Sequence, residues 1–254
     1  MSMSSPRNYI LRLGAITALS LVTTLVQAAS PATLPVPQPE AWWMARHKEK
    51  LVQIRQSPVN LVFIGDSITQ GWESTGRRVW EEFYAPRGAV NLGFNSDCTE
   101  HVLWRLTHGE VDNIAPRLVV LLIGTNNRTS RHESPDETSI GIRAIVDTLH
   151  ARLPTAKLLV LGLLPRGDSP QDALRRHNAR VNAQLHRYAD GHSIFFLDLG
   201  DRFIDHQGRL RRHLMPDQLH PSEDGYRTWA EGMEPVLRRL LRGEVPRAGE
   251  QTTP

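Results

Sequence analysis

Three side chains that could act together as nucleophile, base and orienting acid are spread along this sequence: Ser67, His220 and Asp217. Ser67 lies in the stretch FIGDSITQGW, directly after an apolar run, where a strand would end and a helix would begin. A serine hydroxyl can attack a carbonyl when an imidazole accepts its proton and a carboxylate holds that imidazole in the correct tautomer. Asp217 and His220 are three residues apart in MPDQLHPSEDGY, so a turn entering a helix can fold the carboxylate back onto the histidine.

Each of these motifs also has an ordinary structural explanation. A serine after a strand is most often a helix cap, and an isolated acid and histidine at a helix start usually face solvent. Asn126, in GTNNRTS, would alone be read as a turn residue. Together, however, they supply a nucleophile, a base and an orienting acid. The amide of Asn126 and the backbone N–H of Ser67 could add two donors for a developing oxyanion.

Apolar runs of strand length alternate along the chain with segments of helical pattern. Strands are expected at residues 60–65, 89–93, 117–124, 156–163 and 193–199. Helices are expected near residues 40–56, 77–84, 99–107, 136–152, 171–189 and 222–242. Several strands are apolar on both faces, which is typical of parallel strands covered on both sides. We predict an α/β fold of three layers, with a flavodoxin-like five-stranded parallel sheet and a site beyond the carboxyl ends of its strands.

The first 28 residues differ in composition from the rest. Arg7 and Arg12 precede the apolar run LGAITALSLVTTLV, and small residues follow at VQA, where cleavage near Ala28 is expected. The run is shorter than the roughly 20 residues that span a bilayer. We therefore predict a cleaved secretory signal peptide at residues 1–28, no stable membrane anchor, and a secreted or periplasmic mature protein.

After the signal peptide we expect a Pro-rich linker at residues 29–41, one domain at 42–242 and a polar tail at 243–254. Removing the signal peptide takes away two arginines and no acid, so the formal net charge falls from +3 to +1. Hence no nucleic-acid partner is predicted. The single cysteine, Cys98, precludes an internal disulfide and is expected to pack in the core. No Cys/His cluster has zinc spacing, so neither a metal nor another cofactor is expected.

The motifs resemble those of a known superfamily, in its order. The Gly-Asp-Ser, Gly-Thr-Asn-Asn and Asp-x-x-His blocks are similar to those of the SGNH or GDSL-type hydrolases, over about residues 58–240. TEHVLWRLTHGEVDNIAPRLVVLLIGTNN and LVLGLLPRG most resemble the catalytic subunits of the platelet-activating-factor acetylhydrolase family and their bacterial relatives. The resemblance implies ester hydrolysis with Ser67 as nucleophile, His220 as general base and acid, and Asp217 orienting His220. It also allows a homodimer, because the related subunits associate in pairs.

For the oxyanion hole, the resemblance implies the N–H of Ser67, the side chain of Asn126 and a second backbone N–H. In the family this last donor is normally a glycine, in a Gly-Asp pair after the second strand. Here NLGFNSDCTEH places Ser96 before Asp97. Glycine tolerates positive φ and serine does not do so freely, so Ser96 can serve if its φ is ordinary. We expect the substitution to affect efficiency and pocket shape before it affects the mechanism.

Ile68, Thr125 and Leu219 adjoin the predicted site residues and are expected to wall an acyl pocket. Bulky walls favour a short acyl chain, and one methylene is worth about 1–3 kcal/mol of discrimination. We therefore expect an acetyl ester of a small molecule or glycan, as for an acetylhydrolase or a carbohydrate O-acetylesterase. Two alternatives stay open: a longer-chain lipase or thioesterase using the same site, or a catalytically weak relative that binds carbohydrate or lipid.

Overall fold

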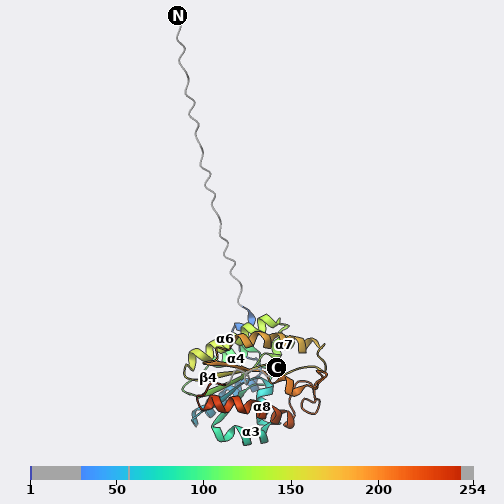
Figure 1. The fold of residues 1–254 in the computed structure, drawn as a ribbon. Coiled ribbons are helices and arrows are strands. Elements are labelled where there is room, and N and C mark those ends of the chain that lie inside the picture. Colours follow the sequence, from blue (N-terminus) through green and yellow to red (C-terminus); the bar gives the residue numbers. More distant parts are fainter. Residues whose placement is uncertain (2–29, 57, 247–254) are drawn as a thin grey trace.

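Five parallel strands form the centre of the molecule in a computed structural model, which describes Met1, residues 30–56 and residues 58–246 (Figure 1). The expected signal peptide, and the part of the expected tail after residue 246, lie outside the described residues. The strands are β1 (Leu61–Gly65), β2 (Ala89–Gly93), β3 (Leu118–Leu122), β4 (Lys157–Leu161) and β5 (Ile194–Leu197). Each falls within an apolar run that predicted it, so the fold class expected from the sequence is confirmed.

The longer helices connect and cover these strands. They are α1 (Ala41–Gln56), α3 (Arg77–Phe83), α4 (Thr99–Thr107), α6 (Pro135–Arg152), α7 (Ala173–Leu185) and α8 (Glu223–Leu241). Two short helices follow strand ends, α2 (Ser67–Gln70) and α5 (Thr125–Arg131). Short 3₁₀ turns are η1 (Pro31–Thr33), η2 (Gly71–Glu73), η3 (Ala85–Arg87), η4 (His186–Tyr188) and η5 (Gly200–Phe203). No helix among the described residues is both long and apolar enough to cross a membrane.

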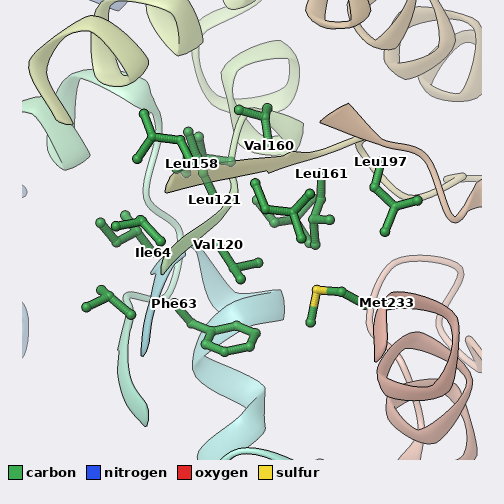
Figure 2. Packing of buried hydrophobic residues seen from close by; sticks show 14 of the residues in the cluster. Phe63, Ile64, Val120, Leu121, Leu158, Val160, Leu161, Leu197 and Met233 are labelled. Atoms are coloured by element: carbon green, nitrogen blue, oxygen red, sulfur yellow. The ribbon is translucent and has the colours of Figure 1, made fainter. Parts of the chain in front are cut away.

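The sheet is covered on both faces, which explains why its strands are apolar throughout. Figure 1 shows α4, α6 and α7 on one side of the sheet and α3 and α8 on the other. Because the register pairs Phe63 with Val120, these two side chains share a face. Figure 2 shows them on the side of Met233, which belongs to α8, while Val160 points to the opposite side. Burial of both faces gives a continuous apolar core around the sheet.

The strand order β2-β1-β3-β4-β5 creates a switch point between β1 and β3. The chain leaves β1 toward β2 on one side and returns to β3 on the other, so the connections that follow β1 and β3 diverge at their carboxyl ends. In open α/β sheets a ligand crevice forms at this position. Ser67 follows β1 and Asn126 follows β3, so the topology places both beside the switch point.

Residues 30–40, expected as part of an extended linker, lie against the helices. Ala32 is fully buried, and its carbonyl oxygen accepts a hydrogen bond from Thr99 Oγ1 (2.9 Å) at the start of α4. The backbone N–H of Val36 donates to Glu100 O (3.3 Å). The proline content gives this segment a mostly irregular backbone, but tertiary contacts hold it in place.

Candidate active site

Ser67 is delivered by a tight turn at the end of β1. Gly65 ends the strand, and a Cβ there would lie 2.2 Å from both Leu122 O and Thr69 Oγ1, so no larger residue fits. Asp66 is the N-cap of α2, and its carboxylate accepts the N–H of Ile68 (2.9 Å). Ser67 is therefore the first residue of a short helix at the sheet edge, with a partly exposed side chain.

Ser67, His220 and Asp217 lie in contact although His220 is 153 positions after Ser67 in the chain. Ser67 Oγ is 2.9 Å from His220 Nε2, and His220 Nδ1 is 2.7 Å from Asp217 Oδ2. With Nδ1–H donating to the carboxylate, Nε2 carries a lone pair that can accept the hydroxyl proton of Ser67. The three residues are thus aligned for proton transfer from serine to imidazole.

The turn before α8 fixes the acid against the histidine. Asp217 Oδ1 accepts backbone N–H bonds from Leu219 (3.0 Å) and His220 (2.7 Å), and Ser222 caps α8. Burial acts to raise the pKa of Asp217, but the hydrogen bonds from His220 and Leu219 outweigh it and hold that pKa below its ordinary value. The carboxylate therefore stays ionised and can stabilise an imidazolium.

Each of the three donors predicted for the oxyanion hole has a hydrogen free to donate. Among the described hydrogen bonds, the N–H groups of Ser67 and Ser96 have no acceptor. Asn126 Nδ2 donates to Asp97 O (3.0 Å), which ties the amide to the loop of Ser96 and leaves its second hydrogen for a ligand. Two N–H groups and one amide hydrogen are thus available to an oxygen beside the serine.

Ser96 does not have the ordinary φ on which its expected role depended. Its φ is +61°, in the left-handed region that glycine adopts readily and serine does not. The loop thus keeps a backbone conformation suited to glycine while carrying a side chain there. A residue other than glycine in this region stores about 1 kcal/mol or more of strain.

The three residues expected to wall an acyl pocket have different environments. Ile68 and Thr125 are buried, and Leu219 is partly buried against the core. Each adjoins a residue of the site in the chain, but a described cavity of about 390 Å³ lies elsewhere, between α7 and the end of β5. It is lined by residues such as Asn182 and Phe196 and does not include Ser67. The acyl pocket therefore stays a prediction.

Arg166 contacts the segment that follows β3, although no role was predicted for it from its place in the sequence. Its Nη1 donates to Thr125 O (3.1 Å) and lies 3.4 Å from Thr125 Oγ1. The next residue, Gly167, donates its N–H to Gln218 O (3.3 Å), inside the turn that carries the acid and the histidine. The loop after β4 thus joins α5 to that turn. The run LLPRG, at the end of a predicted strand, was the available signal.

One group of potential metal ligands occurs among the described residues: Cys98, Glu100 and His101, all buried at the start of α4. His101 Nδ1 accepts the backbone N–H of Cys98 (2.9 Å), which leaves its other nitrogen protonated in the neutral ring. The guanidinium of Arg131 already donates to Glu100 Oε1 (2.7 Å). The positive charge beside this cluster is therefore the Arg131 guanidinium. Cys98 is buried, in agreement with its expected packing role.

A parallel sheet that presents a serine to a histidine at its switch point is the architecture of the SGNH-type hydrolases, and this molecule is an ester hydrolase of that class. The chain belongs to the GDSL-like lipase/acylhydrolase family, whose family model matches residues 63–228.

Relatives in sequence agree with this assignment, and solved structures agree with the fold. Platelet-activating factor acetylhydrolase IB subunit alpha1 of Bos taurus is 36% identical over 225 residues, covering 87% of this chain and 94% of that protein. The Homo sapiens subunit alpha1 is 37% identical over 217 residues, covering 84% and 91% respectively. The solved structure of a GDSL-like lipase from Bacteroides thetaiotaomicron has a TM-score of 0.63 at 21% identity, covering 78% of this chain and 97% of that one. An acetyl-xylooligosaccharide esterase from Geobacillus has a TM-score of 0.57 at 20% identity, covering 72% and 94%.

Proposed function

We propose that this protein hydrolyses short-chain carboxylic esters, acetyl esters above all, through Ser67, His220 and Asp217. The observation that carries the proposal is the continuous pair of contacts, 2.9 Å from Ser67 Oγ to His220 Nε2 and 2.7 Å from His220 Nδ1 to Asp217 Oδ2. A serine that only capped a helix would need neither partner. The alternative of a weakly active binding relative is less favoured for the same reason.

The reaction proceeds by acyl transfer to Ser67. The hydroxyl oxygen attacks the ester carbonyl carbon while His220 Nε2 takes its proton. The carbonyl oxygen becomes an oxyanion held by the N–H groups of Ser67 and Ser96 and by Asn126. Collapse expels the alcohol, which takes the proton from His220. Water activated by the same imidazole then attacks the acyl-enzyme, and the released acid leaves Ser67 free.

The preference for acetyl rests on two supports. The side chains beside the site, Ile68, Thr125 and Leu219, are bulky or branched and adjoin the reacting groups. The relatives that cover most of this chain are named acetylhydrolases. A longer-chain lipase or thioesterase would need the walls to open, and rates against chain length separate the two.

The alcohol part and the compartment are further parts of the proposal. The apolar run behind Arg7 and Arg12 supports export to the periplasm or beyond, where O-acetylated glycans are accessible. The names of the relatives equally support an acetylated phospholipid. We propose a small-molecule or glycan acetyl ester as substrate. A homodimer is one of the assemblies that fits.

The test is hydrolysis of p-nitrophenyl esters from acetyl to octanoyl by purified residues 29–254. The enzyme should cleave p-nitrophenyl acetate fastest, and Ser67→Ala should lower kcat by about a thousandfold or more. Ser130→Ala, an exposed serine on α5, is the matched control and should keep the wild-type rate. The proposal would be refuted if the wild type and Ser67→Ala were equally inactive on every ester. If p-nitrophenyl octanoate were cleaved fastest, the lipase alternative would be favoured.

A further inference from the structure

The oxyanion loop, residues 94–98, has no regular structure of its own to hold it. Asn95 and Ser96 are exposed, and Ser96 has the positive φ described above. An oxyanion donor is effective only when it is already oriented toward the place where negative charge develops. Something outside the loop must therefore fix the direction of the Ser96 N–H.

Gln38 contacts the loop on both sides of Ser96. Its Nε2 donates to Asn95 O (3.0 Å) and to Asp97 Oδ1 (2.7 Å). One amide group thus bridges the residue before the strained serine and the residue after it. Gln38 is buried although its neighbours in the chain are exposed or half-exposed, so these contacts are shielded from water.

Asp97 carries the constraint onward to the second side of the oxyanion hole. Its Oδ1 also accepts Trp43 Nε1–H (2.7 Å), and its Oδ2 accepts Arg105 Nε–H (2.9 Å). Its backbone oxygen accepts the amide of Asn126 (3.0 Å). A shift of Asp97 would therefore move the Ser96 N–H and the Asn126 amide together.

The segment that carries Gln38 is itself anchored. Its Ala32 oxygen accepts from Thr99 Oγ1, and both atoms lie against Gly141 of α6, where a Cβ would come within 2.4 Å of Thr99 Oγ1 and 2.9 Å of Ala32 O. Further along, Val36 N–H donates to Glu100 O. Residues 30–40 are thus fixed to α4 and α6 before they reach the oxyanion loop.

We propose that Gln38, assisted by Trp43, is a positioning residue for the oxyanion hole, and that residues 30–40 are part of the catalytic apparatus. The proposal rests on the proposed function of Ser67, because it assigns the support of that same site. Gln38 touches neither the substrate position nor Ser67. It acts through Asp97 and Asn95 by fixing the loop between them.

The test compares Gln38→Met and Trp43→Phe with the wild-type chain. Methionine keeps the length of Gln38 without its two donors, and phenylalanine keeps most of the ring of Trp43 without Nε1–H. A misplaced oxyanion donor costs less rate than a missing one. Both variants should therefore lower kcat for p-nitrophenyl acetate by about ten- to a hundredfold. KM should stay within about twofold, because the alcohol and acyl contacts are unchanged. A fluorophosphonate, whose phosphoryl oxygen takes the oxyanion position, should label Ser67 more slowly in both variants.

Thr33→Val is the matched control, because Thr33 Oγ1 donates only to Ser30 O (2.8 Å) in the same segment. It should keep the wild-type kcat. If Gln38→Met does not fold, Trp43→Phe, which removes a donor to the same Asp97 Oδ1, gives the readout alone. A wild-type kcat in the folded variants, or a loss confined to KM, would overturn the inference alone. A wild-type chain as inactive as Ser67→Ala would overturn the proposed function and this inference with it.

Discussion

At the scale of single residues, two of the four non-glycine residues with positive φ in the described part of the chain flank the proposed reacting groups. Ser96, in the oxyanion loop, has φ +61°, and Gln218, between the acid and the histidine, has φ +66°. Such conformations persist only where surrounding contacts impose them. Gln38 imposes one, and the hydrogen bond from Gly167 N–H to Gln218 O supports the other. Strain at both places is consistent with a site whose geometry is held more firmly than local sequence preference would allow.

Replacing the strained serine with glycine should stabilise the protein. Glycine adopts the left-handed conformation freely, and the gain exceeds the added entropy of the unfolded chain, so Ser96→Gly should raise the free energy of unfolding by about 0.5–1 kcal/mol. The hydroxyl of Ser96 takes part in none of the described hydrogen bonds, so no contact is lost. Urea unfolding measures the change. Asn113→Gly is the control at φ +61° away from the site, and should gain less because asparagine tolerates this region. A less stable Ser96→Gly would contradict the strain argument.

Asp66 should make stability depend on pH. Burial raises the pKa of Asp66 from 3.8 to about 7, with Asp97 adding to the rise and the Ile68 N–H and Arg166 opposing it. Between these values the folded protein holds a proton that the unfolded chain has released, so stability falls as pH rises. Asp66→Asn removes the titration and can still accept the Ile68 N–H. It should flatten the decline in unfolding free energy between about pH 5 and about pH 7.

Asp205→Asn is the contrasting variant. The backbone N–H of Arg209 lowers the pKa of Asp205, so its contribution to stability is complete above the ordinary value of 3.8 and is lost only at lower pH. The slope between about pH 5 and about pH 7 should therefore stay that of the wild type. An unchanged slope in Asp66→Asn would mean that the Asp66 carboxyl titrates normally in the folded state.

At the scale of elements, the sequence predicted the strands and helices that have a clear local hydrophobic pattern. The apolar runs predicted β1 to β5, and the helical patterns predicted the long helices. Both signals can be recognised within one short stretch of neighbouring residues. The start of α2 at Ser67 was expected from the end of the preceding strand, but α5 was not predicted, because its residues, TNNRTSR, are polar and were read as a turn. Ser67, Asp217 and His220 were predicted together because their motifs carry a recognised order, and the structure brings the three side chains into contact.

Contacts between distant segments were not predictable in the same way. Proline content indicated a linker at residues 29–41, yet Ala32 and Gln38 are buried by contacts with residues about 60 positions away. Arg166 lies in the motif LVLGLLPRG, but its hydrogen bond to Thr125 forms only because β3 and β4 are neighbours in the sheet. The contacts that support the site therefore depend on tertiary geometry, while the residues proposed to react can be recognised in the sequence.

One hydroxyl on α8 contacts the residue that follows Ser67. Tyr226 is buried, and its O–H donates to Ile68 O (2.7 Å), next to Ser67. Tyr226→Phe should lower the free energy of unfolding by about 0.5–1.5 kcal/mol, because a buried carbonyl loses its partner. It should also lower kcat, since α2 is held less firmly. Thermal unfolding and esterase kinetics measure the two effects.

Tyr188→Phe separates these two effects. The Tyr188 hydroxyl bonds to Ser139 on α6, remote from the serine, so its removal should cost stability without lowering kcat. If both tyrosine variants keep the wild-type kcat, the Tyr226 hydroxyl contributes to folding alone. A loss of kcat in Tyr188→Phe as large as that in Tyr226→Phe would show that the rate follows general stability.

At the scale of the whole molecule, a buried charge cluster joins the sheet to the site. Arg105 is fully buried on α4 and pairs with Asp97 and Glu110. It also donates to Leu92 O (3.2 Å), near the end of β2. Removing one member of such a buried cluster leaves uncompensated charge, which costs far more than loss of a surface pair. The same aspartate orients the oxyanion loop, so this cluster links folding to catalysis.

Arg105→Met should therefore lower the free energy of unfolding by about 3–5 kcal/mol at neutral pH. Burial already raises the pKa of Asp97 to about 6 and the pKa of Glu110 above its ordinary value, and Arg105 opposes both shifts. Without the guanidinium both pKa values rise further, so the folded variant takes up protons and the deficit shrinks as pH falls. Urea unfolding across this range measures it. Arg227→Met, which breaks an exposed pair with Glu82, should change stability little at any pH. A deficit in Arg105→Met that stayed constant with pH would mean that lost packing of the long side chain, and not the two buried carboxylates, sets its cost.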